Sequence, residues 1–414
     1  MGRRMANLLT TIYLVMFFFG VFFINIFLVL HYQNRRRLQD HPKPKTFPTI
    51  SFLVPAYNEE ATIKDTISAI INLKYPKGKK EILIINDGSK DKTKEISKAL
   101  SKKYKEVKLL DKKNSGKADS LNHALKIAKG ELVAVTDADS YPKQDALIKM
   151  VGYFEDKKIG AVTSRVLVKN KDNWLSRFQI MDYSIIAWTR KLLDFVDSVY
   201  VTNGPLSIYR KKIVQQVGGF DPKNLTEDIE ITWNILSNGY KTKMSYSAIV
   251  YTTVPEKLKT WISQRVRWNL GGLQTLYKYR RFVFVNPGNL FGYFVIPYVA
   301  LSFILAIIGF LLLSRFFWVK GSFYFYSIFY SFQGYKLFNN FELNLTLTLL
   351  IFIGSIFFVL ALIHYKAGFK ASETGNKSIL KILSYTLIYR PLYIIPLLES
   401  IYKLARRDIR WYTK

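Results

Sequence analysis

Apolar residues form long blocks at the two ends of the chain, whereas the middle alternates short apolar runs with polar ones. The first block, Leu8 to Leu30, runs 23 residues without a charged side chain. About 20 apolar residues in a helix cross the hydrocarbon core of a bilayer. A cleaved signal peptide is the alternative, but the run exceeds a usual signal core and lacks a clear small-residue cleavage site. We therefore predict a transmembrane anchor over residues 1–32.

The carboxyl-side region, residues 286–414, contains two more uncharged runs of spanning length, at 290–314 and 343–363. A further segment, 379–402, is weaker because it is interrupted by Lys381, Arg390, Pro391 and Glu399. Four full spans would leave the Arg-rich carboxyl end outside, whereas the positive-inside rule places it inside. Either 379–402 is interfacial or re-entrant, or the aromatic stretch 322–338 also spans.

Basic residues lie unevenly around the first apolar block. Five follow it closely, namely Arg35, Arg36, Arg37, Lys43 and Lys45, whereas the amino end holds only Arg3 and Arg4. Cytoplasmic flanks of membrane spans carry the excess of Lys and Arg. The pattern predicts a multi-pass protein of the plasma membrane whose polar middle lies in the cytoplasm.

The polar middle, residues 46–255, alternates apolar strand candidates with helical patterns. The strand candidates are TISFLVPA at 49–56, EILIIND at 81–87, VKLLD at 107–111 and ELVAVTDADS at 131–140. Helical patterns separate these strand candidates: the first ends near Leu73, the second is rich in Lys, and the third starts at Ser115. Such alternation is typical of an α/β domain with a parallel sheet and helices on both faces.

Two longer segments show the period of an amphipathic helix. In 258–277, an apolar stripe of Ile262, Val266, Leu270, Leu273 and Tyr277 occupies one face. Gln264, Arg267 and Trp268 centre on the opposite face, and we assign the surrounding 256–285 to an amphipathic interfacial helix. Residues 174–195 carry a second stripe, for which an interfacial helix and a buried core helix fit equally well.

Composition narrows the chemistry. The chain has 61 Lys and Arg against 30 Asp and Glu, a formal net charge of +31. That surplus suits anionic lipid, a nucleotide or nucleic acid, and charge alone does not choose among them. The absence of Cys excludes disulfides, thiolate zinc sites and cysteine nucleophiles. The four His are scattered, without a pair at metal-ligand spacing.

Polar residues follow three of the predicted strands where each strand ends. They are Tyr57, Asn58 and Glu59 after the first, Asp87 after the second, and Asp137 with Asp139 after the fourth. Each alone fits ordinary turn chemistry. Ligands of open α/β sheets bind beyond the carboxyl ends of the strands, so three such ends indicate a binding site. Asp137 and Asp139 suit a divalent ion such as Mg²⁺ or Mn²⁺ that is shared with phosphate oxygens.

Two further segments carry candidate chemistry. In NSGKADSLNHAL, residues 114–125, Lys117 stands just after Gly116 at a helix start, which suits phosphate groups or simply a solvated loop. In LTEDIEITW, residues 225–233, three acids crowd into four positions. They are either the first turn of a helix capped by Thr226, where acids offset the helix dipole, or they include a catalytic base.

The motifs occur in a fixed order: Asp87, then Asp137-Ala-Asp139, then Thr226-Glu227-Asp228, then Gln264-Arg265-Val266-Arg267-Trp268. This ordered set, across residues 50–285, resembles the membrane-integrated, processive family 2 glycosyltransferases, among them hyaluronan, chitin-oligosaccharide and cellulose synthases. GKADSLNHAL, LTEDIEITW and VPEKLKTWISQRVRWNLGG are most similar to poly-β-1,6-N-acetylglucosamine synthases. The resemblance implies a GT-A-type, Rossmann-like cytoplasmic domain with flanking transmembrane helices.

The resemblance also implies roles for individual residues. Asp228 would be the general base, and Asp139 with Asp137 would hold Mg²⁺ or Mn²⁺ on the diphosphate. The nucleotide would be held by Tyr57, Glu59, Asp87, Lys117, Asp137 and Arg267. The acceptor side would be formed by Asn203, Gly204, Pro205, Gln264 and Trp268. Glu227 and Glu230 would serve the helix start and the local charge balance.

The leading hypothesis is an inverting, processive polysaccharide synthase that uses UDP-N-acetylglucosamine. A second is a non-processive transferase that adds one sugar to a lipid, because ceramide glucosyltransferases carry a related Arg-Trp motif. A third is a membrane transporter or scaffold, although the two clearest carboxyl-side spans hold no charged residue for a relay path. The implied partners are a UDP-sugar, a polysaccharide or lipid acceptor and membrane lipid, with no nucleic acid. Because larger synthases of the family have more spans, an accessory membrane subunit is also considered.

Overall fold

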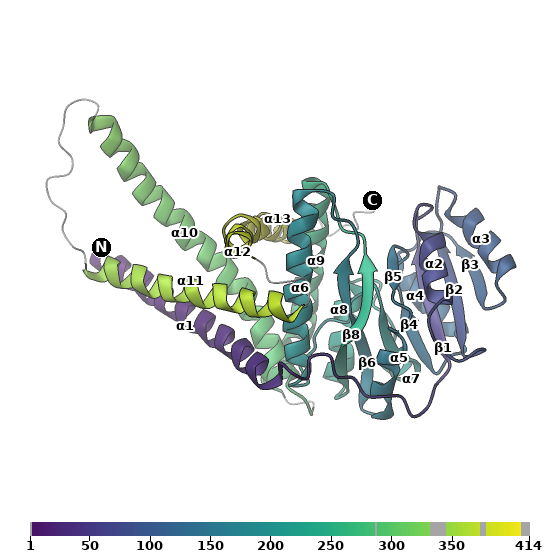
Figure 1. Cartoon of the computed structure of the whole chain (residues 1–414). Helices are drawn as coiled ribbons and strands as arrows, with labels where there is room; N and C mark the ends of the chain where they lie inside the picture. The colour runs from purple at the N-terminus through teal and green to yellow at the C-terminus, as the bar shows by residue number, and fades with distance from the viewer. Residues whose placement is uncertain (1, 286–287, 332–344, 373–377, 407–414) are drawn as a thin grey trace.

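The computed structural model describes residues 2–285, 288–331, 345–372 and 378–406. A sheet domain occupies one end of the molecule and the long helices α1, α10 and α11 occupy the other (Figure 1). These helices span Gly2–Asn34, Ile296–Ser331 and Leu345–Ala371. Within the described residues, three segments are long and apolar enough to cross a membrane: Leu8–Asn34, Phe291–Arg315 and Ile351–Ala371. The first expected run is helical, the second is helical from Phe291 and the third from Leu345, with residues 343–344 outside the described residues.

The sheet has eight strands in the order β3-β2-β1-β4-β7-β6-β8-β5. Their bounds are β1 Ile50–Ala56, β2 Lys80–Asp87, β3 Val107–Lys112, β4 Leu132–Val135, β5 Ser140–Pro142, β6 Ile159–Val168, β7 Ser207–Arg210 and β8 Lys241–Thr252. The four strands expected from the sequence, β1 to β4, are present and mutually parallel.

The parallel sheet expected from the sequence is found for β1 to β4, and β6 pairs with β8 in parallel, but β5 and β7 run in the opposite direction. Strand β7 runs antiparallel to both β4 and β6, and β5 runs antiparallel to β8. The reason is the loop before β7, which crosses the carboxyl edge of the sheet, where the Asp137 N–H donates to the Gly204 carbonyl at 3.1 Å. A strand that starts at this edge, with Ser207 beside Val135, must run back against β4.

Alternate side chains of the central strands pack into two separate cores, as the period of a strand requires. Phe52, Val54 and Ile84 face a core shared with helices α2, α3 and α5. Leu53 and Ile85 face the opposite core, shared with α4, α7 and α8. The helix bounds are α2 Ile63–Ile71, α3 Thr93–Lys103, α4 Lys117–Ile127, α5 Ile148–Val151, α7 Lys211–Gln216 and α8 Glu227–Ser237. Helices thus cover both faces, as predicted.

Helix α6, Trp174–Asp194, joins the sheet domain to the long helices. It contacts β6 and β8 on one side and α1 and α11 on the other. Trp188 is fully buried there, and its indole N–H contacts Nδ1 of His31 at 3.2 Å. Of the two interpretations that the sequence left open for 174–195, the structure therefore favours the buried core helix.

Helix α9, Leu258–Tyr279, packs between α8 and the carboxyl-side segment. That segment is a broken helix: α12 Ile379–Ser384, a π-turn Tyr385–Tyr389, a 3₁₀ turn Arg390–Tyr393, and α13 Ile394–Ala405. It is not among the candidate spans of the described chain. If each of the three candidate spans crosses a membrane once, residues 378–406 lie on the same side as the sheet domain, where the positive-inside rule places the carboxyl end. Of the aromatic stretch 322–338, residues 332–338 lie outside the described residues.

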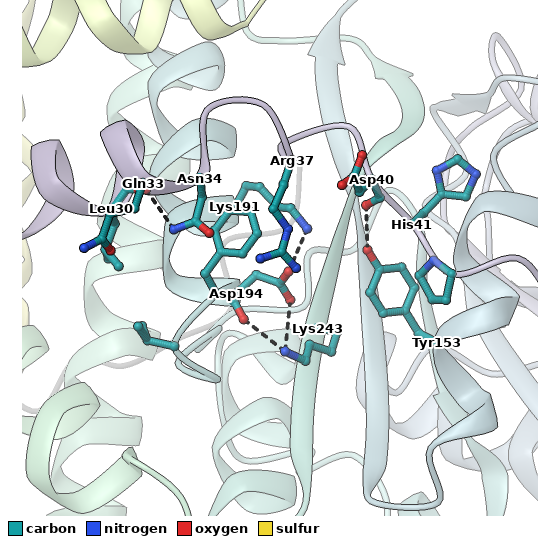
Figure 2. A pocket seen from close by; sticks show the side chains of 13 residues that line it. Leu30, Gln33, Asn34, Arg37, Asp40, His41, Tyr153, Lys191, Asp194 and Lys243 are labelled. Atoms are coloured by element: carbon teal, nitrogen blue, oxygen red, sulfur yellow. Dashed lines mark hydrogen bonds and ion pairs between the residues drawn. The ribbon is translucent and has the colours of Figure 1, made fainter.

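Where the chain leaves α1 it passes over a polar hollow of about 590 Å³ beside the sheet domain (Figure 2). In this hollow Lys191 pairs with Asp194 at 2.7 Å, and the Lys243 ammonium lies 3.9 Å from the same carboxylate. The Tyr153 hydroxyl donates to the Asp40 carbonyl at 3.3 Å, and Arg37 lies over the Phe195 ring. The contacts of Asp40 and Arg37 join the segment after α1 to Tyr153 and Phe195.

Candidate active site

Residues after β1 and β2 meet at the carboxyl edge of the sheet. Asn58, with φ of 55°, donates its N–H to the Ser89 hydroxyl at 3.1 Å, so the two strand ends interlock. Tyr57 is half-buried beside it. The Glu59 carboxylate accepts from the Thr62 hydroxyl at 2.8 Å. The structure therefore brings the expected nucleotide-side residues of β1 to one edge with the end of β2.

Asp87 is buried at the end of β2 and holds the loop that precedes α4. Its carboxylate accepts from the backbone N–H groups of Ser115 at 3.0 Å and Gly116 at 2.9 Å, and it pairs with Lys112 at 2.8 Å. Because α4 starts at Lys117, these bonds set where the lysine stands. The role of Asp87 in holding the nucleotide stays a prediction.

Lys117 ties the end of β4 to the start of α8. Its ammonium lies 2.6 Å from Asp137 Oδ1 and 2.7 Å from Glu227 Oε1. Burial alone would lower the pKa of Lys117, but the carboxylates of Asp137, Glu227 and Asp228 outweigh that effect and raise the pKa. The resemblance implied that Lys117 helps to hold the nucleotide, which stays a prediction. The structure adds that this ammonium pairs with carboxylates of two different elements.

Asp137 and Asp139 are half-buried after β4, as expected for a metal site at a strand end. A Cβ added to Gly204 would meet Asp137 Oδ2 at 2.5 Å, so the loop before β7 approaches this carboxylate as closely as only glycine permits. No group of three or more His, Cys, Asp or Glu suited to a metal occurs among the described residues. Mg²⁺ and Mn²⁺ are commonly held by one or two carboxylates with substrate phosphates and water, so this pair fits such an ion.

The three acids of residues 227–230 lie in three different environments. Helix α8 begins at Glu227, and Thr226 occupies the N-cap position without a side-chain capping bond. Glu227 is buried against Lys117, and Glu230 is buried against Lys278 at 2.6 Å and the Tyr279 hydroxyl at 2.8 Å. Asp228 is half-buried between them.

The carboxyl group of Asp228 has a raised pKa. Burial and the neighbouring Glu227 carboxylate raise the pKa of Asp228 to about 6, against the opposing charges of Lys117 and Arg267. A carboxyl with a pKa near 6 is ionised at neutral pH and is more basic than an ordinary aspartate. The general-base role that the resemblance implies for Asp228 is compatible with this pKa and stays a prediction.

Helix α9 carries Gln264, Arg267 and Trp268, all half-buried. It comes this close to α8 because Gly271 has no side chain: a Cβ there would meet the Thr226 hydroxyl oxygen at 2.1 Å. The positive charge of Arg267 acts on Asp228, which places the two groups in one electrostatic environment. The apolar stripe of the same helix is buried at Val266 and Leu270, so it faces the protein core there.

The loop before β7 contributes Asn203, Gly204 and half-buried Pro205. The Asn203 side-chain oxygen accepts from Arg190 of α6 at 2.6 Å and from the Thr163 hydroxyl. Its Nδ2 is buried without a hydrogen-bond partner among the described residues, so it is available as a donor.

Arg190 is a functional candidate that the sequence analysis missed. Burial lowers its pKa, and Tyr200 and the Asp228 carboxylate oppose this shift, so the guanidinium is within electrostatic reach of the candidate base. The available signal was a charged residue off the apolar stripe of the 174–195 helix. The sequence pattern does not show that the face of this helix carrying Arg190 turns toward the site.

Comparisons with known proteins agree with this geometry. A family model described as "Glycosyltransferase like family 2" matches residues 48–271, more than half of the chain. The chain therefore belongs to this family, which confirms the resemblance found in the sequence and the expectation of a transferase enzyme.

Among characterised relatives, poly-β-1,6-N-acetyl-D-glucosamine synthase of Staphylococcus aureus (strain COL) is 37% identical over 229 residues, covering 55% of each chain. The synthase of the same name from Staphylococcus epidermidis is 36% identical over 230 residues, again covering 55% of each chain. The match thus spans about half the length of these relatives.

Among solved structures, the mannosyltransferase PcManGT from Pyrobaculum calidifontis, in complex with GDP-Man and Mn²⁺, covers 95% of this chain and 98% of its own. Its TM-score is 0.56 and its sequence identity is 17%. At that identity the likeness establishes the fold, a glycosyltransferase domain of GT-A type with accompanying helices, as expected.

Proposed function

We propose that the protein transfers N-acetylglucosamine from UDP-N-acetylglucosamine, with inversion, to the end of a growing polysaccharide at the membrane. The observation that carries the proposal is Asp228. It is a half-buried carboxyl with a pKa raised to about 6, and it shares its electrostatic environment with Lys117, Arg267 and Asp137. The similarity to poly-β-1,6-N-acetyl-D-glucosamine synthases supports the choice of sugar.

In this proposal an acceptor hydroxyl oxygen attacks the anomeric carbon from the side opposite the diphosphate. Its proton passes to a carboxylate oxygen of Asp228, and the bond from the anomeric carbon to the diphosphate oxygen breaks. General base catalysis of this kind typically contributes about 10²–10⁴-fold. Because the pKa of Asp228 is raised, the group is both ionised at neutral pH and basic enough to take the proton.

The departing diphosphate gains negative charge, which cationic groups stabilise. Arg267 would bind it through its planar fork, and Lys117 would contribute a point charge from the start of α4. Asp137 and Asp139 would hold Mg²⁺ or Mn²⁺, which supplies further neutralisation of the diphosphate when bound. Asp137 would contact both the Lys117 ammonium and the metal ion.

The remaining predicted residues divide between donor and acceptor. Tyr57, Glu59 and Asp87 would surround the uridine at the ends of β1 and β2. The Asn203 amide would donate to the acceptor sugar, with Gly204 and Pro205 shaping the loop that carries it. Gln264 and Trp268 would close over the acceptor from α9, since an indole face is a stacking surface for a sugar ring.

We further propose that the protein is a multi-pass protein of the plasma membrane with its catalytic domain in the cytoplasm. Support comes from the three candidate spans and from the basic residues that follow the first of them. Membrane lipid would surround the spans, and an accessory membrane subunit would complete an export path that three helices alone are too few to enclose.

Product length tests the proposal directly. The full chain, purified in detergent, is incubated with Mg²⁺ or Mn²⁺ and radiolabelled UDP-N-acetylglucosamine, and the products are separated on a gel. A ladder or high-mass smear is expected, and the Asp228→Asn variant should lose it. A single labelled band of lipid size would favour the lipid acceptor instead. Absence of both product and released UDP from every UDP-sugar tried would reject the transferase proposal for the isolated chain.

A further inference from the structure

A buried polar cluster joins the carboxyl-side segment to the helix of the Gln264–Trp268 motif. At its centre is Asp182 of α6, which is 1% exposed. Its Oδ1 accepts from the Tyr385 hydroxyl at 3.0 Å, and its Oδ2 accepts from the Tyr393 hydroxyl. Arg390 lies 3.5 Å from Oδ1, and Arg265 of α9 lies 3.7 Å from Oδ2. Three elements far apart in the sequence therefore meet at one carboxylate.

Stability alone gives little reason for this cluster. Buried ion pairs lose solvation, and well-packed apolar residues of similar volume often stabilise a fold as well or better. The surroundings are already aromatic, with Trp261, Tyr385 and Tyr389 buried in the same core. The cluster also leaves one nitrogen of Arg265, Nη2, buried without a hydrogen bond among the described residues. A requirement other than packing is therefore needed to account for it.

Arg265 links the cluster to two of the proposed acceptor residues. On one side its Nε donates to the Tyr393 hydroxyl at 3.1 Å. On the other side its Nη1 donates to Gln264 Oε1 at 2.6 Å, and its guanidinium lies 4.0 Å from the centre of the Trp268 ring. The Tyr393 hydroxyl thus accepts from Arg265 and donates to Asp182, which fixes the plane of the guanidinium.

This arrangement decides which way the Gln264 amide points. A guanidinium can only donate, so the Gln264 atom that faces Arg265 must be the oxygen. The amide nitrogen then faces away from the cluster with its N–H groups available to a substrate oxygen. Trp268 is held by the same guanidinium through its ring face.

We propose that Asp182, Tyr393 and Arg265 are positioning residues that orient Gln264 and Trp268 toward the acceptor. On this proposal Tyr393 is the residue of the segment 379–405 that acts on the acceptor site, because its hydroxyl holds Arg265. The inference rests on the proposed function, since that function gives Gln264 and Trp268 their acceptor role. We call the contacts that run from Asp182 through Tyr393 and Arg265 to Gln264 and Trp268 the positioning relay. Tyr385 is outside this relay: it donates to the same carboxylate, but no contact joins it to Arg265 in the described structure.

The two tyrosines provide a matched pair of variants. Tyr393→Phe and Tyr385→Phe each remove one hydroxyl that donates to Asp182, but only Tyr393→Phe removes the acceptor of the Arg265 Nε bond. The full chain in detergent is assayed for UDP released and for sugar incorporated. A misplaced acceptor lets water take the sugar, so Tyr393→Phe should raise UDP released per sugar incorporated by roughly ten- to a hundredfold, as loss of a hydrogen bond to a charged group would. Tyr385→Phe should leave this ratio unchanged.

A second measurement does not depend on transfer. Fluorotryptophan labelling gives a fluorine NMR signal for each of the seven Trp, and Trp268→Phe assigns the signal of Trp268. Tyr393→Phe should shift or broaden this signal, whereas Tyr385→Phe should not. An unmoved Trp268 signal, or equal changes of the ratio in both variants, would overturn the relay. Failure of the unmodified chain to transfer any sugar would instead reject the proposed function and leave the NMR comparison to decide the relay.

Discussion

At the scale of single residues, environment separates side chains that look alike in the sequence. Glu227, Asp228 and Glu230 are neighbours, yet Glu227 faces Lys117 and Glu230 faces Lys278 and Tyr279. Asp228 alone combines partial burial, a raised pKa and proximity to Arg267. The sequence of the segment allowed both a helix start and a base. The structure shows that Glu227 and Glu230 pair with lysines, and the base role of Asp228 is a proposal.

The raised pKa of Asp228 predicts how activity depends on pH. The base works only when ionised, so its active form is present above pH about 6 and is lost as the pH falls through that value. The rate of transfer at limiting substrate should fall about tenfold for each pH unit on the acid side. A pH–rate profile of the purified chain measures this limb. A flat profile between pH 5 and pH 7 would contradict the assignment.

Glu227→Gln should move the acid limb of that profile to lower pH. The Glu227 carboxylate raises the pKa of Asp228, so neutralising it lowers the pKa and keeps the base ionised in more acidic solution. Glu230→Gln is the matched control on the same turn of α8, because its partners are Lys278 and Tyr279. The same displacement in both variants would mean that the limb reports general loss of charge rather than the Glu227–Asp228 pair.

The carboxylates after β4 predict metal dependence. Addition of EDTA should abolish transfer, and Mn²⁺ or Mg²⁺ in excess should restore it. Asp139→Asn should lower the rate by about 10²–10³-fold, the cost of losing one group that stabilises developing charge. Asp145→Asn is the control, since that aspartate forms a surface pair with Lys149 and should leave the rate unchanged. An unaltered rate in EDTA would remove the metal role of Asp139.

The acids at strand ends were predictable because they depend on local pattern alone. An apolar run followed by Asp137 and Asp139 places the carboxylates at a sheet edge whatever the remainder of the chain does. Arg190, Asp182 and Tyr393 were not predictable in this way. Arg190 meets Asn203 of the loop before β7. Asp182 of α6 meets Arg265 of α9 and Tyr393 of the carboxyl-side segment, about 80 and 200 residues away along the chain, and no periodicity relates these positions.

At the scale of elements, the reversal of β7 and the approach of α9 form the site. The reversed strand follows from a loop that carries Gly204 over the strand ends to Asp137. The sequence analysis expected a parallel sheet and did not foresee the reversed strands β5 and β7, because alternation of strands and helices does not encode the direction of each strand. It did find the α9 segment and its two faces, since a run of 22 helical residues is a long periodic signal.

The Gly271–Gly272 pair in α9 predicts opposite effects for two alanine substitutions. Gly271→Ala adds a Cβ 2.1 Å from the Thr226 hydroxyl oxygen, so α9 must move away from α8. Such overpacking costs about 1–3 kcal/mol, and a shift of about 1 Å at a site can lower a rate about a hundredfold. Gly272→Ala meets only the Phe303 ring at 3.5 Å. It should be neutral or stabilise by up to about 1 kcal/mol through helix propensity. Thermal unfolding and transfer rates are measured for both variants. Equal behaviour of the two variants would contradict the close approach of α9 to α8.

At the scale of the whole molecule, three candidate spans lie on one side of the sheet domain and the broken segment 379–405 returns to it (Figure 1). The hydropathy of the sequence located the three spans because each is long and uncharged. It could not place 379–402, whose charged interruptions fit several arrangements. Arg390 lies in the cluster around Asp182, and Glu399 pairs with Lys403 at 2.7 Å. Both charged side chains therefore contact other residues of the protein.

This arrangement predicts that the carboxyl-side segment and the catalytic domain lie on the same side of the membrane. Because the chain has no Cys, a single introduced cysteine reports its own location. Three variants are compared: Lys103→Cys on exposed α3, Arg406→Cys after α13, and Asn339→Cys between the second and third candidate spans. In intact spheroplasts a membrane-impermeant maleimide should label only Asn339→Cys, and after permeabilisation it should label all three. Labelling of Arg406→Cys in intact spheroplasts would mean that 379–405 crosses the membrane. Tyr393 could then not reach Arg265 from the cytoplasmic side, so this result would also reject the positioning relay.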